Sequence, residues 1–391
     1  MSTSELTLPP PVGAPVRRRW PVVLGVLLAV ILVAVIVSAV VSAPYYELVP
    51  GQAMSVSELI TVPPEHAHKP TGKVLLTDVG VNTMKYITFI PAWLDSNAEV
   101  VPSDQLTADL PVSEFDAQGT VDMSESQLTA EAVALRQLGY EVPEHDAGVT
   151  VYVIDPTSPA WKALHVGDVI TAIDGVATPN PDALQSVLRR HQPGETITLR
   201  VGSITAPAPG HDVPLKLASI REDNGTVEPF IGIGIPHPRF VIPPMGTQPV
   251  YDLPFKVDIS SDNIGGPSAG LAFTLGIINS LSGGHLTGGK VVAATGTIRP
   301  DGSVGDVGGV AQKTVAVERA GATLFLVPPE ELKVARSKAT PSLTVKAVST
   351  LAQAMADLEQ IGGRLGPAAN GPPMGDGGHS VPYDWQNAPW T

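Results

Sequence analysis

The most pronounced feature of the hydropathy pattern is one long apolar run near the N-terminus. Residues 20–43 carry no charged side chain, and 20 residues of this run, 22–41, would span about 30 Å as a helix. That length matches the hydrocarbon core of a bilayer. Arg17, Arg18 and Arg19 precede the run directly, and basic residues favour the cytoplasmic side. The pattern predicts a single-pass protein of the cell membrane, with a cytoplasmic N-terminus at 1–19, a transmembrane helix at 20–43 and all later residues outside.

A cleaved signal peptide is the alternative interpretation of the same run. Val41-Ser42-Ala43 has the small residues of a cleavage site, and cleavage there would give a secreted protein. The apolar part of a signal peptide usually has only about 7–15 residues. The greater length of this run favours an uncleaved anchor.

Short apolar stretches separated by turns follow the predicted span. Residues 44–123 mix β-like runs, such as Lys73 to Thr77 and Tyr86 to Ile90, with Pro-rich turns, and we assign this β-rich region no role. Residues 124–138 predict a helix, because Leu128, Ala132, Leu135 and Leu138 fall on one face.

A strand, turn, strand, helix and strand follow one another between residues 148 and 201. Alternating apolar side chains predict strands at 149–153, 168–173 and 197–201, and Pro181 to Arg190 predicts a helix. The Asp174-Gly175 pair after the second strand is typical of a hairpin turn.

This order, with Ser158-Pro-Ala and Leu164-His-Val-Gly-Asp-Val-Ile-Thr-Ala-Ile-Asp-Gly175, resembles a bacterial PDZ domain, which we place at residues 124–203. The resemblance implies a groove between a strand edge and the 181–190 helix, where an extended peptide binds as an added strand. Leu138-Gly139-Tyr140 is a candidate for the carboxylate-binding loop of such domains. A PDZ-like spacer that binds nothing is the alternative.

The pattern changes again after a Pro- and Gly-rich joint at 204–215. Residues 213–361 alternate strands and helices, which predicts an α/β domain. Residues 362–391 are rich in Gly, Pro and Asn without periodicity, and they predict a disordered tail. Trp385 and Trp390 leave open a docking peptide within this tail.

Composition excludes several classes of function. The chain of 391 residues has no Cys, which excludes disulfides, a Cys nucleophile and Cys-ligated metals. Its formal charge of −14 argues against nucleic-acid binding, since a phosphate backbone requires a surface of Lys and Arg. We expect no cofactor and no metal.

The candidate nucleophile is Ser268. A strand predicted at 255–259 precedes Gly265-Gly-Pro-Ser-Ala-Gly270, and an apolar helix is predicted at 271–281. A helix N-terminus offers backbone N–H groups to a developing oxyanion. Because Pro267 has no N–H, the candidate oxyanion donors are the backbone of Ser268 and of Gly266 or Gly265. An ordinary Gly-rich turn with an N-capping serine is the alternative.

A serine nucleophile needs a base, and Lys313 is the candidate. It lies on the apolar stripe of a helix predicted at 310–320, and a buried lysine can be neutral. A lysine that extends to the surface is the alternative. A Ser-His-Asp triad with His237 or His285 stays open, and Lys290 is a weaker lysine at a turn.

Four motifs in order resemble the protease domain of the Lon family: Gly266-Pro-Ser-Ala-Gly270, Ala294-Thr-Gly-Thr-Ile298, Gly308-Gly-Val-Ala-Gln-Lys313 and Ala320-Gly-Ala-Thr-Leu-Phe-Leu-Val-Pro328. The resemblance implies that Ser268 is the nucleophile, that Lys313 is the base and that Thr295 hydrogen-bonds the lysine. It also implies homo-oligomeric rings.

The chain departs from many Lon proteases in two respects. An acidic residue often stands three positions before the serine, where this chain has Gly265. The nearest approach to an ATP-binding loop is Gly284 to Lys290, but Val291 replaces the Ser or Thr that would hold magnesium. We therefore expect no ATP-driven motor. The predicted transmembrane helix, the PDZ-like insert and the Lon-type domain together resemble the YlbL-like, PDZ-containing Lon-like proteases of bacteria.

The sequence thus predicts a membrane-anchored, ATP-independent serine endopeptidase. Its architecture is an α/β Lon-type proteolytic domain with an inserted or preceding PDZ-like domain and one N-terminal transmembrane helix. Its partners would be unfolded or exposed polypeptide segments. The alternative is a membrane-tethered PDZ adaptor whose Lon-like domain is a scaffold without proteolytic activity.

Overall fold

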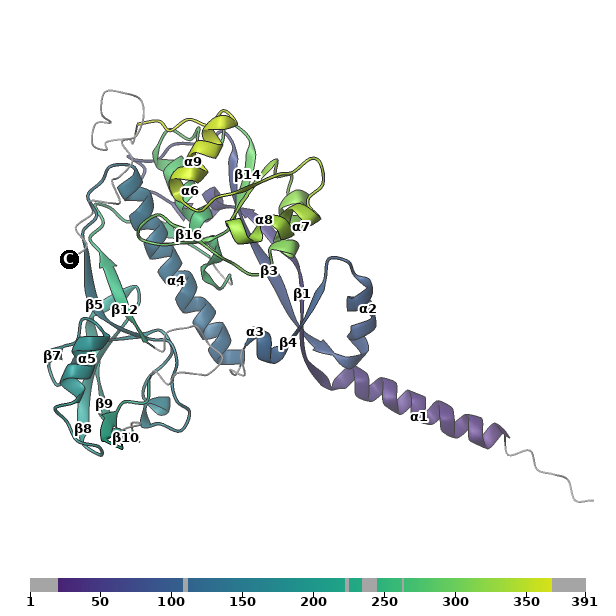
Figure 1. Ribbon diagram of the computed structural model, residues 1–391, viewed down its shortest axis with the longest axis horizontal. Helices are drawn as coiled ribbons and strands as arrows, with labels where there is room; N and C mark the ends of the chain where they lie inside the picture. The colour runs from purple at the N-terminus through teal and green to yellow at the C-terminus, as the bar shows by residue number, and fades with distance from the viewer. Residues whose placement is uncertain (1–19, 108–111, 222–224, 234–244, 262–263, 368–391) are drawn as a thin grey trace, which may run out of the picture.

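The computed structural model describes residues 20–107, 112–221, 225–233, 245–261 and 264–367. The N-terminus at 1–19, most of the predicted tail, with Trp385 and Trp390, and His237 lie outside these residues. Helix α1, Trp20–Val40, extends away from the rest of the protein (Figure 1). Its residues 22–40 have a mean hydropathy of 3.2, and the helix is long and apolar enough to cross a membrane.

A six-stranded mixed sheet forms the centre of the larger domain. Its order is β18-β17-β14-β3-β1-β4, with β14, β17 and β18 parallel to β3, and β1 antiparallel to β3 and β4. The strands are β1 (Ser42–Ser55), β3 (Lys73–Lys85), β4 (Glu99–Pro102), β14 (Val291–Ala294), β17 (Leu324–Val327) and β18 (Thr344–Ala347).

The sequence alone indicated no role for residues 44–123, and this sheet shows a structural one. Half of its strands come from residues 42–102, far from the 213–361 segment that shows the α/β pattern. Local sequence could not indicate this, because the buried position of β3 depends on its pairing with β14, a strand more than 200 residues away.

Helices cover both faces of this sheet. Leu76 and Leu326 point to one face, which packs against α4 (Val112–Gln137), α6 (Gly270–Leu281) and α9 (Leu351–Gln360). Leu75 and Phe325 point to the other face, against α7 (Val310–Arg319) and α8 (Leu332–Lys338). Neighbouring residues of one strand thus belong to two different cores, as the pleat requires.

The smaller domain is a second sheet with the order β12-β5-β6-β8-β9, to which β7 (Val176–Ala177) adds beside β6. Its strands are β5 (Glu144–Val151), β6 (Asp168–Ile173), β8 (Thr196–Ser203), β9 (Ala206–Lys216) and β12 (Met245–Tyr251). Helix α5 (Pro181–Leu188) packs Leu184, Val187 and Leu188 into this domain's core. A hairpin of β10 (Ala218–Arg221) and β11 (Val227–Phe230) stands beside the sheet.

The small domain is inserted between α4 and β13 (Asp258–Ile259) of the large one, which moves its expected borders. Within the range 124–203, the helix part belongs to the large domain, because Ala130, Ala134 and Leu135 are buried in that core. At the other end, β9 and β12 belong to the small sheet although they lie beyond residue 203.

The predicted joint at 204–215 is wrong, since β9 covers Ala206–Lys216 and pairs with β8. β9 lies at the edge of the sheet, and an edge strand tolerates proline because its outward N–H groups need no partner. Pro-rich composition was therefore compatible with a strand.

One further expectation of local structure is corrected. Tyr86 to Ile90 is not a strand: a 3-10 turn at Tyr86–Thr88 leads into the short helix α2, Phe89–Leu94. Leu138-Gly139-Tyr140 forms the end of α4, and its role as a carboxylate-binding loop stays a prediction. Gly139 has a φ of 85°, its N–H donates to Arg136 and that of Tyr140 donates to Leu135, which closes the helix.

Candidate active site

The loop that carries Ser268, here the serine loop, comprises residues 265–269. Its last three residues form a 3-10 turn, Pro267–Ala269, which continues directly into α6. Gly266 begins the turn with a φ of 86°, a conformation that side chains rarely adopt. A Cβ on Gly270 would come within 2.9 Å of Ile298 and of Ser126 Oγ, so glycine allows α6 to approach its neighbours closely.

Lys313 is provided by α7, whose N-cap, Gly309, has a left-handed φ of 67°. A Cβ there would clash with Val79 at 2.5 Å, so only glycine lets the helix begin against β3. One turn later the Lys313 side chain is buried, with 3% of its surface exposed. The alternative of a lysine that extends to the surface does not hold, whereas Lys290 is exposed.

Thr295 connects the lysine to the serine loop. It follows β14 directly and is fully buried. Lys313 Nζ donates to Thr295 Oγ1 at 3.3 Å, and Thr295 Oγ1 donates to the backbone oxygen of Ser268 at 3.2 Å. The hydrogen bonds of the described residues do not include a direct one between Lys313 Nζ and Ser268 Oγ.

The surroundings of Lys313 favour its neutral form. Burial lowers the pKa of its amine to about 8, because little water remains to solvate the charge. The negative charges of Asp78 and Glu331 act in the opposite direction and raise that pKa, but by less. At mildly alkaline pH, near this pKa, a substantial fraction of Lys313 is therefore neutral and can accept a proton.

Ser268 and Lys313 face the same cavity, which has a volume of about 1040 Å³. Its walls come from the serine loop, from the start of α7 and from α4, which provides Phe115, Gln118 and Met123. Four carboxylates line it, and among the described residues Lys313 is its only basic side chain. These carboxylates are Asp78, Asp116, Asp122 and Asp306.

The serine loop is held against α4 by two hydrogen bonds. The Gly266 N–H donates to the Gly119 carbonyl at 2.7 Å, and Ser126 Oγ donates to the Pro267 carbonyl at 3.1 Å. The first bond occupies the Gly266 N–H, so this expected oxyanion donor is not free in the structure. Gly265 and the backbone of Ser268 stay predictions as donors.

Gln118 is a site residue that the sequence did not reveal. Its side chain is 5% exposed, it lines the cavity, and its Nε2 lacks a hydrogen-bond partner among the described residues. Such a donor suits a substrate carbonyl. The sequence analysis did not select Gln118 because it predicted a helix only from residue 124, whereas α4 begins at Val112 and therefore includes Gln118.

The other candidates lie elsewhere. His285 Nδ1 is 3.2 Å from Thr71 Oγ1, and His285 does not line the cavity. Residues Gly284 to Lys290 form turns that lead into strand β14, where a phosphate-binding loop would open a helix. Among the residues that the structure describes, no three His, Asp or Glu side chains are grouped to hold a metal ion.

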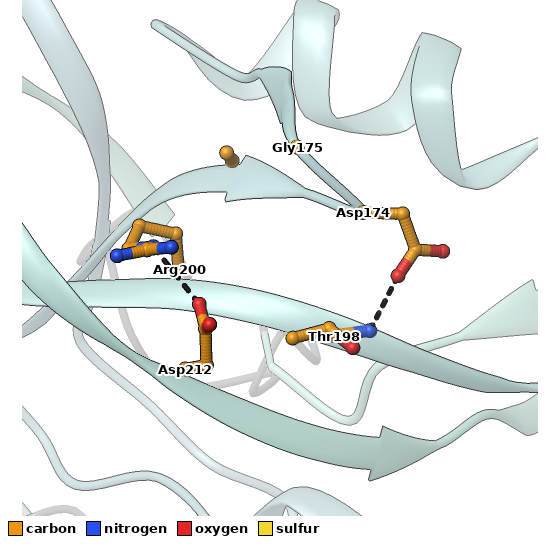
Figure 2. Close-up of a pocket in the computed structure, with 6 residues that line it drawn as sticks. Asp174, Gly175, Thr198, Arg200 and Asp212 are labelled. Carbon is orange, nitrogen blue, oxygen red and sulfur yellow. Dashed lines mark hydrogen bonds and ion pairs between the residues drawn. The ribbon is translucent and has the colours of Figure 1, made fainter.

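A second, smaller cavity of about 320 Å³ lies on the sheet of the small domain (Figure 2). Arg200 and Asp212 form an ion pair across it at 2.9 Å, and Asp174 accepts from the Thr198 N–H at 2.7 Å. Arg200 and Asp212 are thus paired with each other and Asp174 with the backbone, and none of the lining residues belongs to the serine cavity.

Comparison with known proteins agrees with both domains. Residues 137–202 match the PDZ domain, and residues 260–358 match the Lon protease (S16) C-terminal proteolytic domain. The chain therefore combines a PDZ domain with a Lon-type proteolytic domain, and the expected fold class is confirmed with the PDZ domain as the insert.

Individual relatives resemble parts of the chain. A Lon protease of Chloroflexus aggregans is 39% identical over 67 residues, which is 17% of this chain and 8% of that protein. The PDZ domain of an SdrC-like protein from Listeria monocytogenes is 27% identical and covers 22% of this chain and 84% of its own, with a TM-score of 0.19. Its Listeria innocua counterpart is also 27% identical, covers 23% and 94%, and has a TM-score of 0.19.

Proposed function

We propose that this chain is a membrane-anchored, ATP-independent serine endopeptidase with Ser268 as nucleophile and Lys313 as general base. The observation that carries the proposal is the buried amine of Lys313, connected through Thr295 to the serine loop within one cavity. The match to a Lon-type proteolytic domain supports a peptidase in general.

In the proposed reaction, Ser268 Oγ attacks the carbonyl carbon of a peptide bond while the neutral Lys313 amine takes the hydroxyl proton. Backbone N–H groups of the serine loop hold the resulting oxyanion. When the intermediate collapses, the C–N bond breaks and Lys313 returns the proton to the leaving amine. Water, activated by the same amine, then hydrolyses the acyl-enzyme and regenerates the serine.

In the proposed reaction, substrate binding has to bring Lys313 Nζ within hydrogen-bond distance of Ser268 Oγ. Lys313 Nζ donates to Thr295 in the free protein, and catalytic hydrogen bonds often tighten only in the substrate complex. Gln118 would contribute a donor to a carbonyl of the bound segment.

A tethered adaptor with an inactive Lon-like scaffold is the rival. The ion pairs of the described residues include none to Lys313, and a scaffold gains nothing from a buried amine without a counter-charge in contact. A fluorophosphonate probe on the full chain distinguishes the two. Labelling at Ser268 supports the protease, whereas unlabelled Ser268 in a folded chain supports the adaptor.

Thr295→Val should lower kcat about tenfold, the equivalent of about 1.4 kcal/mol, because Lys313 loses the oxygen that orients its amine. Thr295→Ser keeps that oxygen and should retain most of the activity. Steady-state cleavage of a fluorogenic peptide measures both. Equal activities of the two variants would remove the proposed role of Thr295.

The PDZ domain would deliver substrate. Among the described strands, the terminal strand β12 pairs only with β5, and it lies beside α5, so its other edge could receive an extended segment. This arrangement supports peptide binding at the β12 edge over the spacer alternative.

Because the chain lacks Cys, a single photo-crosslinker can be placed on that edge at Thr247→Cys. An unfolded substrate should crosslink there several-fold more than at Val334→Cys, an exposed control on α8. Similar yields at both positions would favour the spacer.

We further propose that α1 spans the cell membrane with its N-terminus in the cytoplasm. A continuous apolar helix, exposed over most of its length, supports an anchor. N-terminal sequencing of the protein isolated from membranes tests this against cleavage after Ala43.

A further inference from the structure

An exposed apolar patch lies beside the end of α1. The segment from Tyr86 to Leu94 has no charged residue, and five of its large side chains point into solvent. Trp93 is 83% exposed, Ile90 71% and Leu94 70%. The other two are Tyr86 and Ile87. Such a group of apolar side chains on a water-facing surface indicates an interaction site.

The segment is nevertheless a fixed part of the fold. Ala92 is buried against Ala43 and Met84, and Phe89 packs with them. The Tyr45 and Phe89 rings meet edge to face, with centroids 5.1 Å apart. The inner face of α2 is therefore packed, and Ile90, Trp93 and Leu94 form an outer face that the described residues leave uncovered.

The strand register places this outer face next to the predicted membrane. β1 begins at Ser42, two residues after α1 ends, and Ser42 pairs with Lys85. The chain after Lys85 thus continues beyond the end of the sheet toward α1. The 3-10 turn at 86–88 contacts α1, and α2 lies beside the body-side end of that helix (Figure 1).

We propose that this outer face of residues 86–94 binds the phospholipid bilayer that α1 spans, in the leaflet at the C-terminal end of α1. The proposal rests on the membrane anchoring proposed above. The patch is continuous with the lipid-facing surface of α1, and tryptophan and tyrosine are the side chains that favour the membrane–water interface. A span and a second lipid contact together would fix the tilt of the protease above the bilayer, which a single helix leaves free.

The absence of Cys allows a direct test in the full chain. Ile90→Cys and, in case it misfolds, Leu94→Cys are labelled with an environment-sensitive fluorophore and reconstituted in phosphatidylcholine vesicles. Leu32→Cys within α1 is the positive control, and Val334→Cys on α8 is the exposed control. We expect blue-shifted emission and strong quenching by lipids brominated on their acyl chains at positions 90, 94 and 32, and neither effect at 334.

Quenching at position 32 but not at 90 or 94 would overturn the inference and leave the anchor intact. No quenching at any position would remove both the anchor and the inference. A blue shift at 90 that persists in detergent, rises with protein concentration and is insensitive to bromine would show a second copy of the chain on the patch, which also overturns it. Proteolysis is not the readout, so the result is independent of the Ser268 mechanism.

Discussion

Ser268→Ala should reduce kcat/KM for an unstructured polypeptide by about a thousandfold or more, because the proposed mechanism loses the only atom that bonds covalently to the substrate. Alanine fits the 3-10 turn, and the hydrogen bonds among the described residues include none from the Ser268 hydroxyl. We therefore expect an unchanged melting temperature.

Cleavage of a denatured reporter protein by the full chain in detergent measures the effect. Ser337→Ala is a matched control, since that exposed hydroxyl donates to the Val334 carbonyl within its own helix. Wild-type activity in Ser268→Ala, with the control also active, would refute the nucleophile.

Lys313→Met should be inactive and yet more stable than the wild type near pH 7. Methionine has a similar unbranched length and carries no charge that must be desolvated. The folded-state pKa of Lys313 is about 8, against 10.5 for an ordinary lysine, so the charged form is disfavoured by folding. Removing it should add about 1–3 kcal/mol to the free energy of unfolding.

The sign of the pH dependence follows from proton binding. Between about 8 and 10.5 the unfolded chain binds more protons at this position than the folded chain, so wild-type stability rises with pH in that window. The advantage of Lys313→Met should thus be complete below about 8 and shrink as the pH rises toward 10.5. Wild-type kcat/KM should rise with pH through the same pKa as the free amine becomes a base.

Denaturant titrations of both proteins at several pH values test this expectation, with the exposed Lys290→Met as control. A Lys313→Met variant that is less stable than the wild type at neutral pH would contradict it, as would an advantage that does not change with pH.

Local patterns in the sequence were sufficient to select Ser268 and Lys313 as candidates, and their chemical roles stay predictions. Ser268 lies between a Gly-rich turn and a helix that is apolar all round, and Lys313 occupies the apolar stripe of an amphipathic helix. Both signals depend on a few neighbouring residues, and the structure buries Lys313 and places both residues on one cavity.

The sequence failed where structure depends on distant partners. The pairing of β3 with β14, the position of α4 against the serine loop and the orphan donor of Gln118 all arise from residues far apart in the chain. The Pro-rich strand β9 was predicted as a joint, because proline is acceptable in a strand only at a sheet edge and the sequence does not show that position.

The insertion of the PDZ domain also orders events during synthesis. β1 and β3 emerge early, but the parallel neighbour of β3 begins at Val291, after the whole insert. Pairing across so long a stretch is slow, and an unpaired strand edge is prone to aggregation. The nascent chain therefore keeps this edge of β3 unpaired until β14 has been synthesised. Under the proposed function it would also lack its general base until Lys313 has been added.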